Sequence, residues 1–470
     1  MRQEIMTKKK LHVHFMGIGG SALAGVATLA KAAGFKVSGC DLQQKTYYSP
    51  ILKKEKIKYF LGHNVEHLKS VDMVAVSAAV YPVKSPHPEV IEAKKRKILI
   101  SWQEFQGKYL QKGKVVIAIA GTHGKSTTTA LVGLVLESGG LNPLVEVGAI
   151  VPQWESTIRF GLGKYFVCEA DEFNNNFLNY SPGIIIINNL EMDHPEFFQD
   201  ENQFRKAFKN FIQKIKEPKV LIVNEESQGI QKLLTEMKPW LREEKVKVIG
   251  YFLKNNFSFP FDKEYQGEII KQNQELTQFK TQEKIFNLKV PGKHNVFNAL
   301  GAVVCGEEVG INFEKIRIAL ENFKGVGRRF DLVGEEKGIK VYEDYAVHPT
   351  AIEAALEAVR QKYPQQKIWA IFEPHQYSRL KIFLSDFARV LKSADEIIIT
   401  AIFPGREKFN PQIKAKDLVD KIGDKAEYLE NFEEISEKIS QKAKINDIII
   451  VFGAGKSYLL TKMILEKLSR

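Results

Sequence analysis

Short apolar runs alternate with longer amphipathic stretches along this chain, and this alternation predicts strands connected by helices. In the middle of the chain, strands are expected at 115–119, 165–168, 183–187 and 219–223. Continuous apolar runs of this length are typical of parallel strands that helices cover on both faces. The pattern therefore predicts an α/β fold with a parallel sheet. Residues 246–290, where short strands alternate with turn residues, are expected to form an antiparallel edge.

The same alternation continues on both sides of this middle part. Before it, we expect strands at 12–16, 35–39 and 73–76 and a helix at 21–33. After it, we expect strands at 339–342, 367–372, 396–400 and 447–452 and helices at 350–362 and 381–392. A chain of 470 residues is long enough for about three domains of ~150 residues. We therefore predict three α/β domains: a Rossmann-like domain at 1–113, a P-loop domain at 114–325 and a second Rossmann-like domain at 326–470.

A glycine loop between the strand at 115–119 and a helix expected at 127–137 is the most informative local feature. Its residues are Gly121, Thr122, His123, Gly124, Lys125, Ser126 and Thr127. Strand, glycine loop and helix together form a phosphate cradle, because the amides at a helix N-terminus attract anions. Lys125 is placed to reach terminal phosphates, and the Ser126 hydroxyl to bind magnesium. Ile119 stands where the general motif has its first glycine. The alternative is a plain tight turn, which leaves the Gly-Lys-Ser sequence without a role.

A second glycine turn follows the strand at 12–16. Gly17, Gly19 and Gly20 precede the helix at 21–33, and Asp41 ends the next strand, as at the start of a dinucleotide-binding domain. Such a turn suits any nucleotide diphosphate, so an NAD-dependent oxidoreductase is one alternative. That alternative leaves the Gly-Lys-Ser loop unexplained. A non-catalytic nucleotide-binding protein would explain the loop but not the polar residues near the C-terminal end.

Polar residues follow several other expected strands. Glu169 and His194 come at the ends of neighbouring strands, where parallel sheets form a ligand crevice. A carboxylate and an imidazole there can hold magnesium ions that bridge nucleotide phosphates. The alternative is that Glu169 caps a helix and His194 lies on the surface. Asn295 either caps a helix expected at 296–309 or contacts a nucleotide.

Further candidates lie near the junction of the second and third domains and beyond it. Arg328 and Arg329 could reach a γ-phosphate across a cleft, or could belong to a solvated basic linker. Asp344 ends a strand, and His348 precedes the helix at 350–362. Arg379 follows the strand at 367–372, where a guanidinium can hold a substrate carboxylate.

Composition narrows the classes of function. No apolar run approaches the roughly 20 residues that span a bilayer, so we expect a cytoplasmic protein without membrane insertion. The net charge of +12 suits an enzyme that acts on anionic nucleotides. The lysines are spread along the chain rather than gathered in one arm, and this distribution disfavours nucleic-acid binding. Cys40, Cys168 and Cys305 lie far apart without a CxxC pair, which predicts neither zinc nor disulfides but small buried residues.

An ordered set of motifs over nearly the whole chain resembles the Mur ligase family, the ATP-dependent amide-forming enzymes of peptidoglycan synthesis. The motifs are at 17–20, 37–41, 62–64, 121–129, 169–172, 193–194, 291–295, 323–330, 344–346, 348–350 and 374–379. One such loop is easily matched by chance, whereas the ordered set is not. The resemblance implies an enzyme that uses ATP and magnesium to join L-alanine to the lactoyl carboxylate of UDP-N-acetylmuramate through an acyl phosphate.

The resemblance also implies a role for each matching residue. Gly17, Gly19 and Gly20 would lie near the diphosphate of the UDP substrate, and Asp41 and His63 near its uridine. Lys125 would neutralise the phosphates of ATP, and Asn295, Arg329 and Asp344 would complete the ATP site. Ser126, Glu169 and His194 would bind magnesium. Arg379 would bind the carboxylate of the amino acid, with His348 close by.

Some positions depart from the family pattern. Val347 stands where members usually carry a histidine, and Gln376 where some carry a second arginine. The runs at 169–174 and 189–194 resemble a related recycling ligase, which attaches a whole tripeptide to UDP-N-acetylmuramate. The run at 374–379 instead favours L-alanine, and we weigh it most because that domain would choose the amine. The resemblance is compatible with a monomer or a homodimer.

Overall fold

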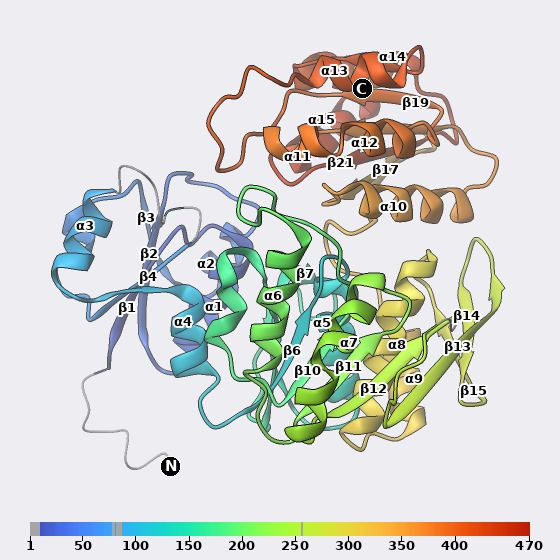
Figure 1. Ribbon diagram of the computed structural model, residues 1–470. Coiled ribbons are helices and arrows are strands. Elements are labelled where there is room, and N and C mark those ends of the chain that lie inside the picture. The colour runs from blue at the N-terminus through green and yellow to red at the C-terminus, as the bar shows by residue number, and fades with distance from the viewer. Residues whose placement is uncertain (1–9, 78–79, 81–86, 255–256) are drawn as a thin grey trace.

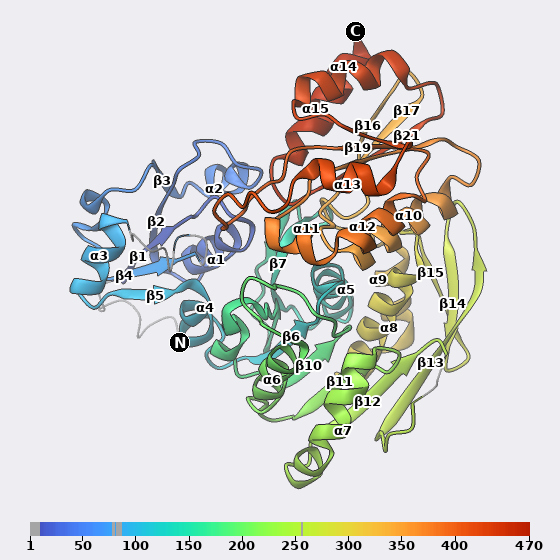
Figure 2. The ribbon, with the colours of Figure 1, turned by 45° about the horizontal axis from the view of Figure 1, so that its top comes forward.

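The computed structural model describes residues 10–77, 80, 87–254 and 257–470, so the first nine residues of the predicted first domain lie outside it. Three sheets follow one another along the chain. In Figure 1 the N-terminal part, in blue, lies beside the green and yellow central part, and the orange and red C-terminal part lies above the central part. Figure 2 shows the same arrangement with the C-terminal part turned forward. The predicted three-domain α/β fold is confirmed, whereas the predicted domain boundaries stay predictions.

The N-terminal sheet has five parallel strands in the order β3-β2-β1-β4-β5, which is a Rossmann-like arrangement. Its strands are β1 (His12–Met16), β2 (Lys36–Asp41), β3 (Lys58–Leu61), β4 (Met73–Val76) and β5 (Leu99–Ser101). Its helical segments are α1 (Ser21–Ala32), α2 (Ser49–Lys54), η1 (Val65–Leu68), α3 (Pro88–Lys95), α4 (Trp102–Phe105) and η2 (Gln106–Leu110). Apolar side chains of α1 cover one face of this sheet, and those of η1 and α3 cover the other.

The central sheet has ten strands in the order β15-β14-β13-β12-β11-β10-β6-β9-β7-β8. Its strands are β6 (Val115–Ala120), β7 (Leu144–Val151), β8 (Ser156–Arg159), β9 (Tyr165–Glu169), β10 (Ile184–Ile187), β11 (Val220–Asn224), β12 (Lys247–Phe252), β13 (Lys263–Gln272), β14 (Thr277–Thr281) and β15 (Lys284–Leu288). Its helices are α5 (Lys125–Ser138), η3 (Phe173–Asn179), α6 (Glu201–Ile212), α7 (Gln228–Glu243), α8 (Lys293–Glu308) and α9 (Phe313–Glu321). Helices α6 and α7 pack on one face, and α5, α8 and α9 on the other.

The antiparallel edge predicted at 246–290 is confirmed only in part. Strands β13, β14 and β15 are antiparallel to one another, but β12 pairs parallel to β11, and β13 pairs parallel to β12. The parallel sheet therefore extends further than the sequence predicted. The short, interrupted pattern of this region did not distinguish a strand that continues the parallel sheet from one that begins a hairpin.

The C-terminal sheet has six strands in the order β16-β17-β21-β18-β19-β20, and only the pairing of β16 with β17 is antiparallel. Its strands are β16 (Asp331–Glu336), β17 (Ile339–Asp344), β18 (Ile368–Phe372), β19 (Glu396–Ile399), β20 (Ala426–Tyr428) and β21 (Ile448–Phe452). Its helices are α10 (Pro349–Lys362), α11 (Tyr377–Ile382), α12 (Leu384–Leu391), α13 (Ala415–Ile422), α14 (Phe432–Lys442) and α15 (Ser457–Ser469). The predicted helix at 381–392 is interrupted at Phe383, where α11 ends and α12 begins.

Two helix starts differ from the prediction in a way that matters for the site. Helix α5 begins at Lys125 rather than Thr127, so the lysine and the serine of the glycine loop belong to its first turn. Helix α8 begins at Lys293, with Gly292 at its N-cap, so Asn295 lies within the helix. The alternative in which Asn295 caps this helix is therefore wrong. Within the described ranges, no helix combines the length and the apolar character that crossing a membrane requires.

Candidate active site

A cavity of about 1110 Å³ lies between the central and the C-terminal domain. The ends of β6, β9 and β10 reach it from the central sheet, and the ends of β17 and β18 reach it from the C-terminal sheet. It brings together most of the residues that the sequence singled out. Those that line it are Thr122, His123, Gly124, Lys125, Ser126, Thr127, Glu169, His194, Asn295, Arg329, Asp344, His348 and Arg379.

The backbone conformation of the loop and its close packing both require glycine at positions 121 and 124. Gly121 and Gly124 have φ values of +128° and +79°, which side chains rarely adopt. A Cβ on Gly121 would lie 2.9 Å from the carbonyl oxygen of Asn189, and a Cβ on Gly124 would lie 2.3 Å from Oδ1 of Asn298. The loop is thus pressed against the end of β10 and against α8. This packing places the N-terminus of α5 at the cavity, where the first-turn amides have no partner within the helix.

Lys125 is held by a carboxylate beneath the loop. Its Nζ lies 3.0 Å from Oε2 of Glu172 and donates to the carbonyl oxygen of Gly121 at 2.5 Å. Burial alone would lower the pKa of Lys125, but the carboxylates of Glu172 and Asp171 outweigh that effect and raise it. Lys125 is therefore a cation at neutral pH, at the place where a nucleotide phosphate would meet the loop.

His194 lies among carboxylates at the other side of the loop. Its Nδ1 lies 3.2 Å from Oε1 of Glu196, and its Nε2 lies 3.7 Å from Oε1 of Glu172 and 3.9 Å from Oδ2 of Asp193. Burial alone would lower the pKa of His194, but these three neighbours raise it instead. A residue in such surroundings attracts positive charge, either as a proton or as a metal ion.

The residues predicted to bind magnesium offer suitable donors. Ser126, Glu169 and His194 line the same cavity. Asp171, Glu172 and His194 provide one donor atom each within 4.8 Å of one another. Hydroxyl and carboxylate oxygens are the ligands that magnesium prefers, so the donor set fits this ion. Glu169 accepts a hydrogen bond from the amide of Gly148 on the neighbouring strand β7, so it does not cap a helix.

Arg379 comes from the C-terminal domain and contacts the central domain. Its Nη2 lies 2.6 Å from Oδ1 of Asp193, and its Nη1 donates to Nδ1 of His375 at 2.9 Å. Burial alone would raise the pKa of Asp193, but the guanidinium of Arg379 holds it well below its usual range. Burial lowers the pKa of His375 to about 3, so this histidine is neutral and can accept the hydrogen bond.

His348, at the N-cap of α10, is a neutral imidazole at the same side of the cavity. Burial lowers its pKa to about 4, and its ring centroid lies 4.9 Å from that of His123. Nε2 of His123 in turn lies 2.6 Å from Oε1 of Glu191. Among the residues that the structure describes, Nε2 of His348 is a buried nitrogen without a hydrogen-bond partner. It is therefore available to a group that enters the cavity. Val347, the adjacent departure from the family pattern, also lines the cavity.

The two arginines at the domain junction have different positions. Arg328 is buried, with its Nε 2.6 Å from Oε1 of Glu343 and its Nη2 bonded to the carbonyl oxygen of Gly453. It is neither a linker residue in solvent nor a lining residue of the cavity. Arg329 is partly exposed, lies over the ring of Tyr345 at 4.8 Å and lines the cavity. Only Arg329 can meet a bound phosphate.

Residues predicted to meet the UDP substrate lie in the N-terminal domain, outside this cavity. The amide of Gly19 donates to Oδ2 of Asp41 at 3.0 Å, and the amide of Gly20 donates to the carbonyl oxygen of Gly17. Asp41 therefore closes the glycine turn. The side chain of His63 is buried, and its Nδ1 lies 3.0 Å from Sγ of Cys40. Their roles toward UDP stay predictions.

Comparison with known proteins places this arrangement in a family. Residues 12–112 match the Mur ligase family catalytic domain, 119–306 the Mur ligase middle domain, and 328–455 the Mur ligase glutamate ligase domain. UDP-N-acetylmuramate–L-alanine ligase of Alkaliphilus metalliredigens is 35% identical over 465 residues, covering 97% of each chain. The ligase of the same name from Acetivibrio thermocellus is also 35% identical, over 97% of this chain and 96% of its own. The chain belongs to the Mur ligase family.

Solved structures agree with this membership. The crystal structure of UDP-N-acetylmuramate-alanine ligase from Thermotoga maritima is 25% identical, covers 97% of this chain and 99% of its own, and superposes with a TM-score of 0.79. A murein peptide ligase from Psychrobacter arcticus, 23% identical and covering 98% and 99%, shares the fold with a TM-score of 0.72. Membership confirms the predicted ATP-dependent ligase class, and it leaves the oxidoreductase and the non-catalytic alternatives without support.

Three carboxylates that hold cavity-lining residues of this Mur ligase were not selected from the sequence. Glu172 holds Lys125, Asp193 holds Arg379, and Glu191 holds His123. A signal was present, because all three follow apolar strands whose ends were expected to form the crevice. The sequence could not indicate which carboxylate pairs with which cation, since the partners are up to 186 residues apart.

Proposed function

We propose that this Mur ligase uses ATP to join L-alanine to the carboxylate of UDP-N-acetylmuramate in peptidoglycan precursor synthesis. The observation that carries the proposal is the cavity, in which the phosphate loop of the central domain faces Arg379 and His348 of the C-terminal domain. Two relatives with that named activity, each 35% identical over nearly the full length, support the choice of substrates.

The phosphate loop would receive ATP. A carboxylate is a poor acylating agent, because its charge repels nucleophiles and oxide is a poor leaving group. Attack by a carboxylate oxygen of UDP-N-acetylmuramate on the γ-phosphorus would give an acyl phosphate and ADP. Lys125 and the first-turn amides of α5 would stabilise the charge on the transferring phosphoryl group. Asn295, Arg329 and Asp344 would complete this side of the cavity.

Ser126, Glu169 and His194 would hold magnesium, whose charge when bound would further stabilise the phosphoryl oxygens. Binding of the ion requires a neutral His194, so the imidazole would give up the proton that its carboxylate neighbours favour. Glu172 forms an ion pair with the Lys125 ammonium. A bound phosphate would take over part of that interaction, which would leave Glu172 free to face His194.

The C-terminal side of the cavity would receive the amino acid. Arg379 would bind its carboxylate, because a guanidinium offers two parallel donors that match a carboxylate. The neutral Nε2 of His348 would accept a hydrogen bond from the incoming amine, whose ammonium form must first lose a proton to solvent before it attacks the acyl carbon. The amine then forms the amide bond as phosphate leaves. Closure of two domains around these groups would keep water from the acyl phosphate.

The proposal is tested by phosphate release from ATP with magnesium and UDP-N-acetylmuramate. L-Alanine, L-serine, glycine and the tripeptide are added separately, and the mass of each product is measured. Release that requires L-alanine and gives the alanyl product would support the proposal. Release with the tripeptide alone would assign the chain to recycling, and release with no amine product would contradict ligase activity.

A further inference from the structure

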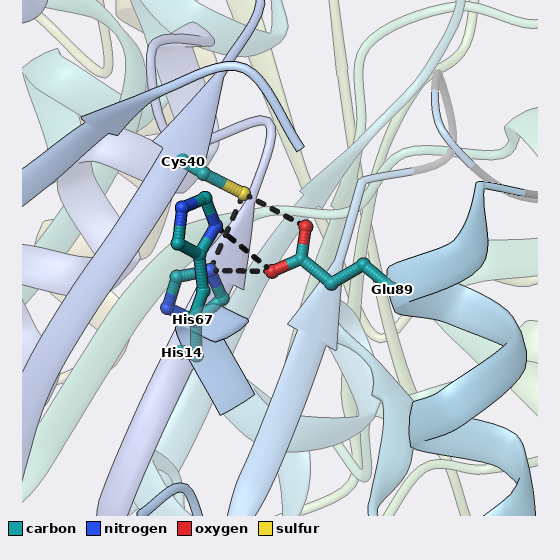
Figure 3. Close-up of side chains that lie close together, drawn as sticks. All are labelled: His14, Cys40, His67 and Glu89. Atoms are coloured by element: carbon teal, nitrogen blue, oxygen red, sulfur yellow. Dashed lines mark hydrogen bonds and ion pairs between the residues drawn. The ribbon is translucent and has the colours of Figure 1, made fainter. Parts of the chain in front are cut away.

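Four metal-ligating side chains meet inside the N-terminal domain, away from the cavity described above. They are His14 on β1, Cys40 on β2, His67 on η1 and Glu89 on α3, and Figure 3 shows their donor atoms converging on one point. Each offers one ligand atom, and these atoms all lie within 4.8 Å of one another. The side chains of His14 and Glu89 are fully buried, Cys40 is fully buried, and the His67 side chain is 12% exposed.

Four distances between polar atoms of the cluster are close to those between the ligands of a tetrahedral ion. Nε2 of His14 lies 3.1 Å from Oε1 of Glu89 and 3.3 Å from Sγ of Cys40. Nδ1 of His67 lies 3.3 Å from the same Oε1, and Sγ of Cys40 lies 3.4 Å from Oε2. A tetrahedral ion with bonds of about 2.0 Å to nitrogen and oxygen and about 2.3 Å to sulfur places its donors about 3.3–3.5 Å apart. The side chains therefore need little rearrangement to surround such an ion.

Among the residues that the structure describes, two of the ligand atoms lack the hydrogen bond that buried polar atoms normally make. Within the described part of the chain, Nδ1 of His67 and Oε1 of Glu89 are both buried without a hydrogen-bond partner. Both atoms are therefore available to a cation that binds at the centre of the cluster.

Neighbouring groups hold the ligands in place, as outer groups do around metal sites. Nδ1 of His14 lies 2.9 Å from the hydroxyl of Ser38, which leaves Nε2 directed at the cluster. The ring of His67 stacks on Phe60 at 4.3 Å between centroids. Nδ1 of His63, 3.0 Å from Sγ of Cys40, is placed to donate a hydrogen bond to a thiolate.

We propose that His14, Cys40, His67 and Glu89 form a binding site for a divalent transition-metal ion of the Zn²⁺ class. Mixed imidazole, thiolate and carboxylate ligands in a tetrahedral arrangement select zinc over magnesium, which prefers six oxygen donors. On binding, the Cys40 thiol releases its proton to solvent and the thiolate bonds to the metal. No sequence motif indicates this site, because its ligands come from four separate elements rather than from a CxxC pair.

The site connects to the glycine turn of the same domain. The carbonyl oxygen of Cys40 accepts hydrogen bonds from the amides of Gly17, at 2.8 Å, and Ile18, at 3.2 Å. The next residue, Asp41, binds the amide of Gly19. A metal ion on Cys40 would therefore fix the strand end that closes this turn and would tie β1, β2, η1 and α3 together. Its role is structural, and it is independent of the ligase function proposed above.

The test uses the full chain, stripped of metal with a chelator and titrated with Co²⁺ as a spectroscopic probe. A site with a thiolate ligand gives a thiolate-to-cobalt charge-transfer band and the strong visible bands of tetrahedral Co²⁺. An ion bound at the magnesium site of the large cavity lacks a thiolate and gives neither. We expect saturation at one ion per chain and displacement by an equal amount of Zn²⁺, with a rise in melting temperature.

Cys40→Ser and His67→Ala are the informative variants, and Cys305→Ser, at a buried cysteine on α8, is the matched control. Cys40→Ser should abolish the charge-transfer band. His67→Ala should weaken Co²⁺ binding at least about tenfold, because it removes one ligand. Cys305→Ser should leave the band and the Co²⁺ affinity unchanged. His67 is partly exposed, so its variant tests the site even if Cys40→Ser fails to fold. Absence of the charge-transfer band in the wild type, or its persistence in Cys40→Ser, would overturn the proposal.

Discussion

Arg379 of the C-terminal domain and Asp193 of the central domain form a buried ion pair across the cavity, with Nη2 2.6 Å from Oδ1. Among the described residues, Nε of Arg379 is a buried donor without a hydrogen-bond partner. Asp193 therefore orients the guanidinium but does not use all of its donors. The pair links the domain that would bind ATP to the domain that would bind the amino acid.

Arg379→Lys is expected to raise the KM for L-alanine at least about tenfold, because an ammonium cannot replace the two parallel donors of a guanidinium. The KM for ATP should change little. Arg389→Lys on the outer surface of α12, where Arg389 pairs with the exposed Glu353, is the matched control and should behave as the wild type. Steady-state kinetics with each substrate varied in turn will measure this. An unchanged KM for L-alanine in Arg379→Lys would remove Arg379 from the amino-acid site.

Lys125→Ala is expected to lower kcat by about 10²–10³-fold, because it removes a positive group from the transferring phosphoryl oxygens. Lys112→Ala, at an exposed lysine before β6, should leave kcat unchanged. Phosphate release at saturating substrates measures both, with circular dichroism to confirm folding. If folded Lys125→Ala kept wild-type kcat, the loop would be a structural turn.

Gly124→Ala and Gly140→Ala separate backbone strain from close packing. Both glycines have a left-handed φ, +79° and +76°, but only the Cβ at Gly124 would collide with Asn298, whereas that at Gly140 would meet open space. Gly140→Ala should therefore cost about 1–2 kcal/mol of unfolding free energy and keep activity. Gly124→Ala should cost more and lose ATP affinity, because it displaces the loop. Denaturant unfolding and nucleotide binding will compare them, and equal effects would contradict the packing at Asn298.

Burial of His348 makes the free energy of unfolding depend on pH. Its pKa is lowered from 6.5 to about 4 by burial, so the unfolded chain binds this proton more readily than the folded one. The unfolding free energy should therefore fall as the pH drops from about 6.5 toward 4, with a contribution on the order of 1–2 kcal/mol at about pH 5. His348→Asn keeps a good helix cap and should flatten the curve in this range. An unchanged pH dependence in the variant would show that His348 does not titrate as its burial indicates.

Much of the fold could be predicted from the sequence, because most strands near the site are continuous apolar runs bounded by glycine or polar residues. β6, β9, β10 and β21 were each located to within one residue of their ends. β7 and β13 were harder, because Glu146 and Gly148 interrupt the apolar run of β7 and most residues of β13 are polar and exposed. β12 is a buried apolar strand, but its parallel pairing with β11 could not be predicted because pairing depends on residues distant in the chain.

The sequence predicted which residues belong to the site, but it did not predict which of them pair with one another. Lys125 and Arg379 were recognised from local motifs, but their carboxylate partners could be found only from the packed structure. Likewise, the adjacent residues Arg328 and Arg329 look equivalent in sequence. The fold buries the first against Glu343 and leaves the second at the cavity. Three-dimensional packing, rather than residue type, decides which of the two can meet a ligand.

The proposed reaction requires that ATP activate the muramyl carboxylate in this cavity before the amine attacks. The most direct measurement uses UDP-N-acetylmuramate with isotopically labelled carboxylate oxygens, and follows the label by mass spectrometry in the phosphate and in the alanyl product. Each phosphate released in the presence of L-alanine should carry one labelled oxygen, because that oxygen bonds to phosphorus in the acyl phosphate. Unlabelled phosphate would mean that water attacks ATP directly, and would contradict the proposed reaction.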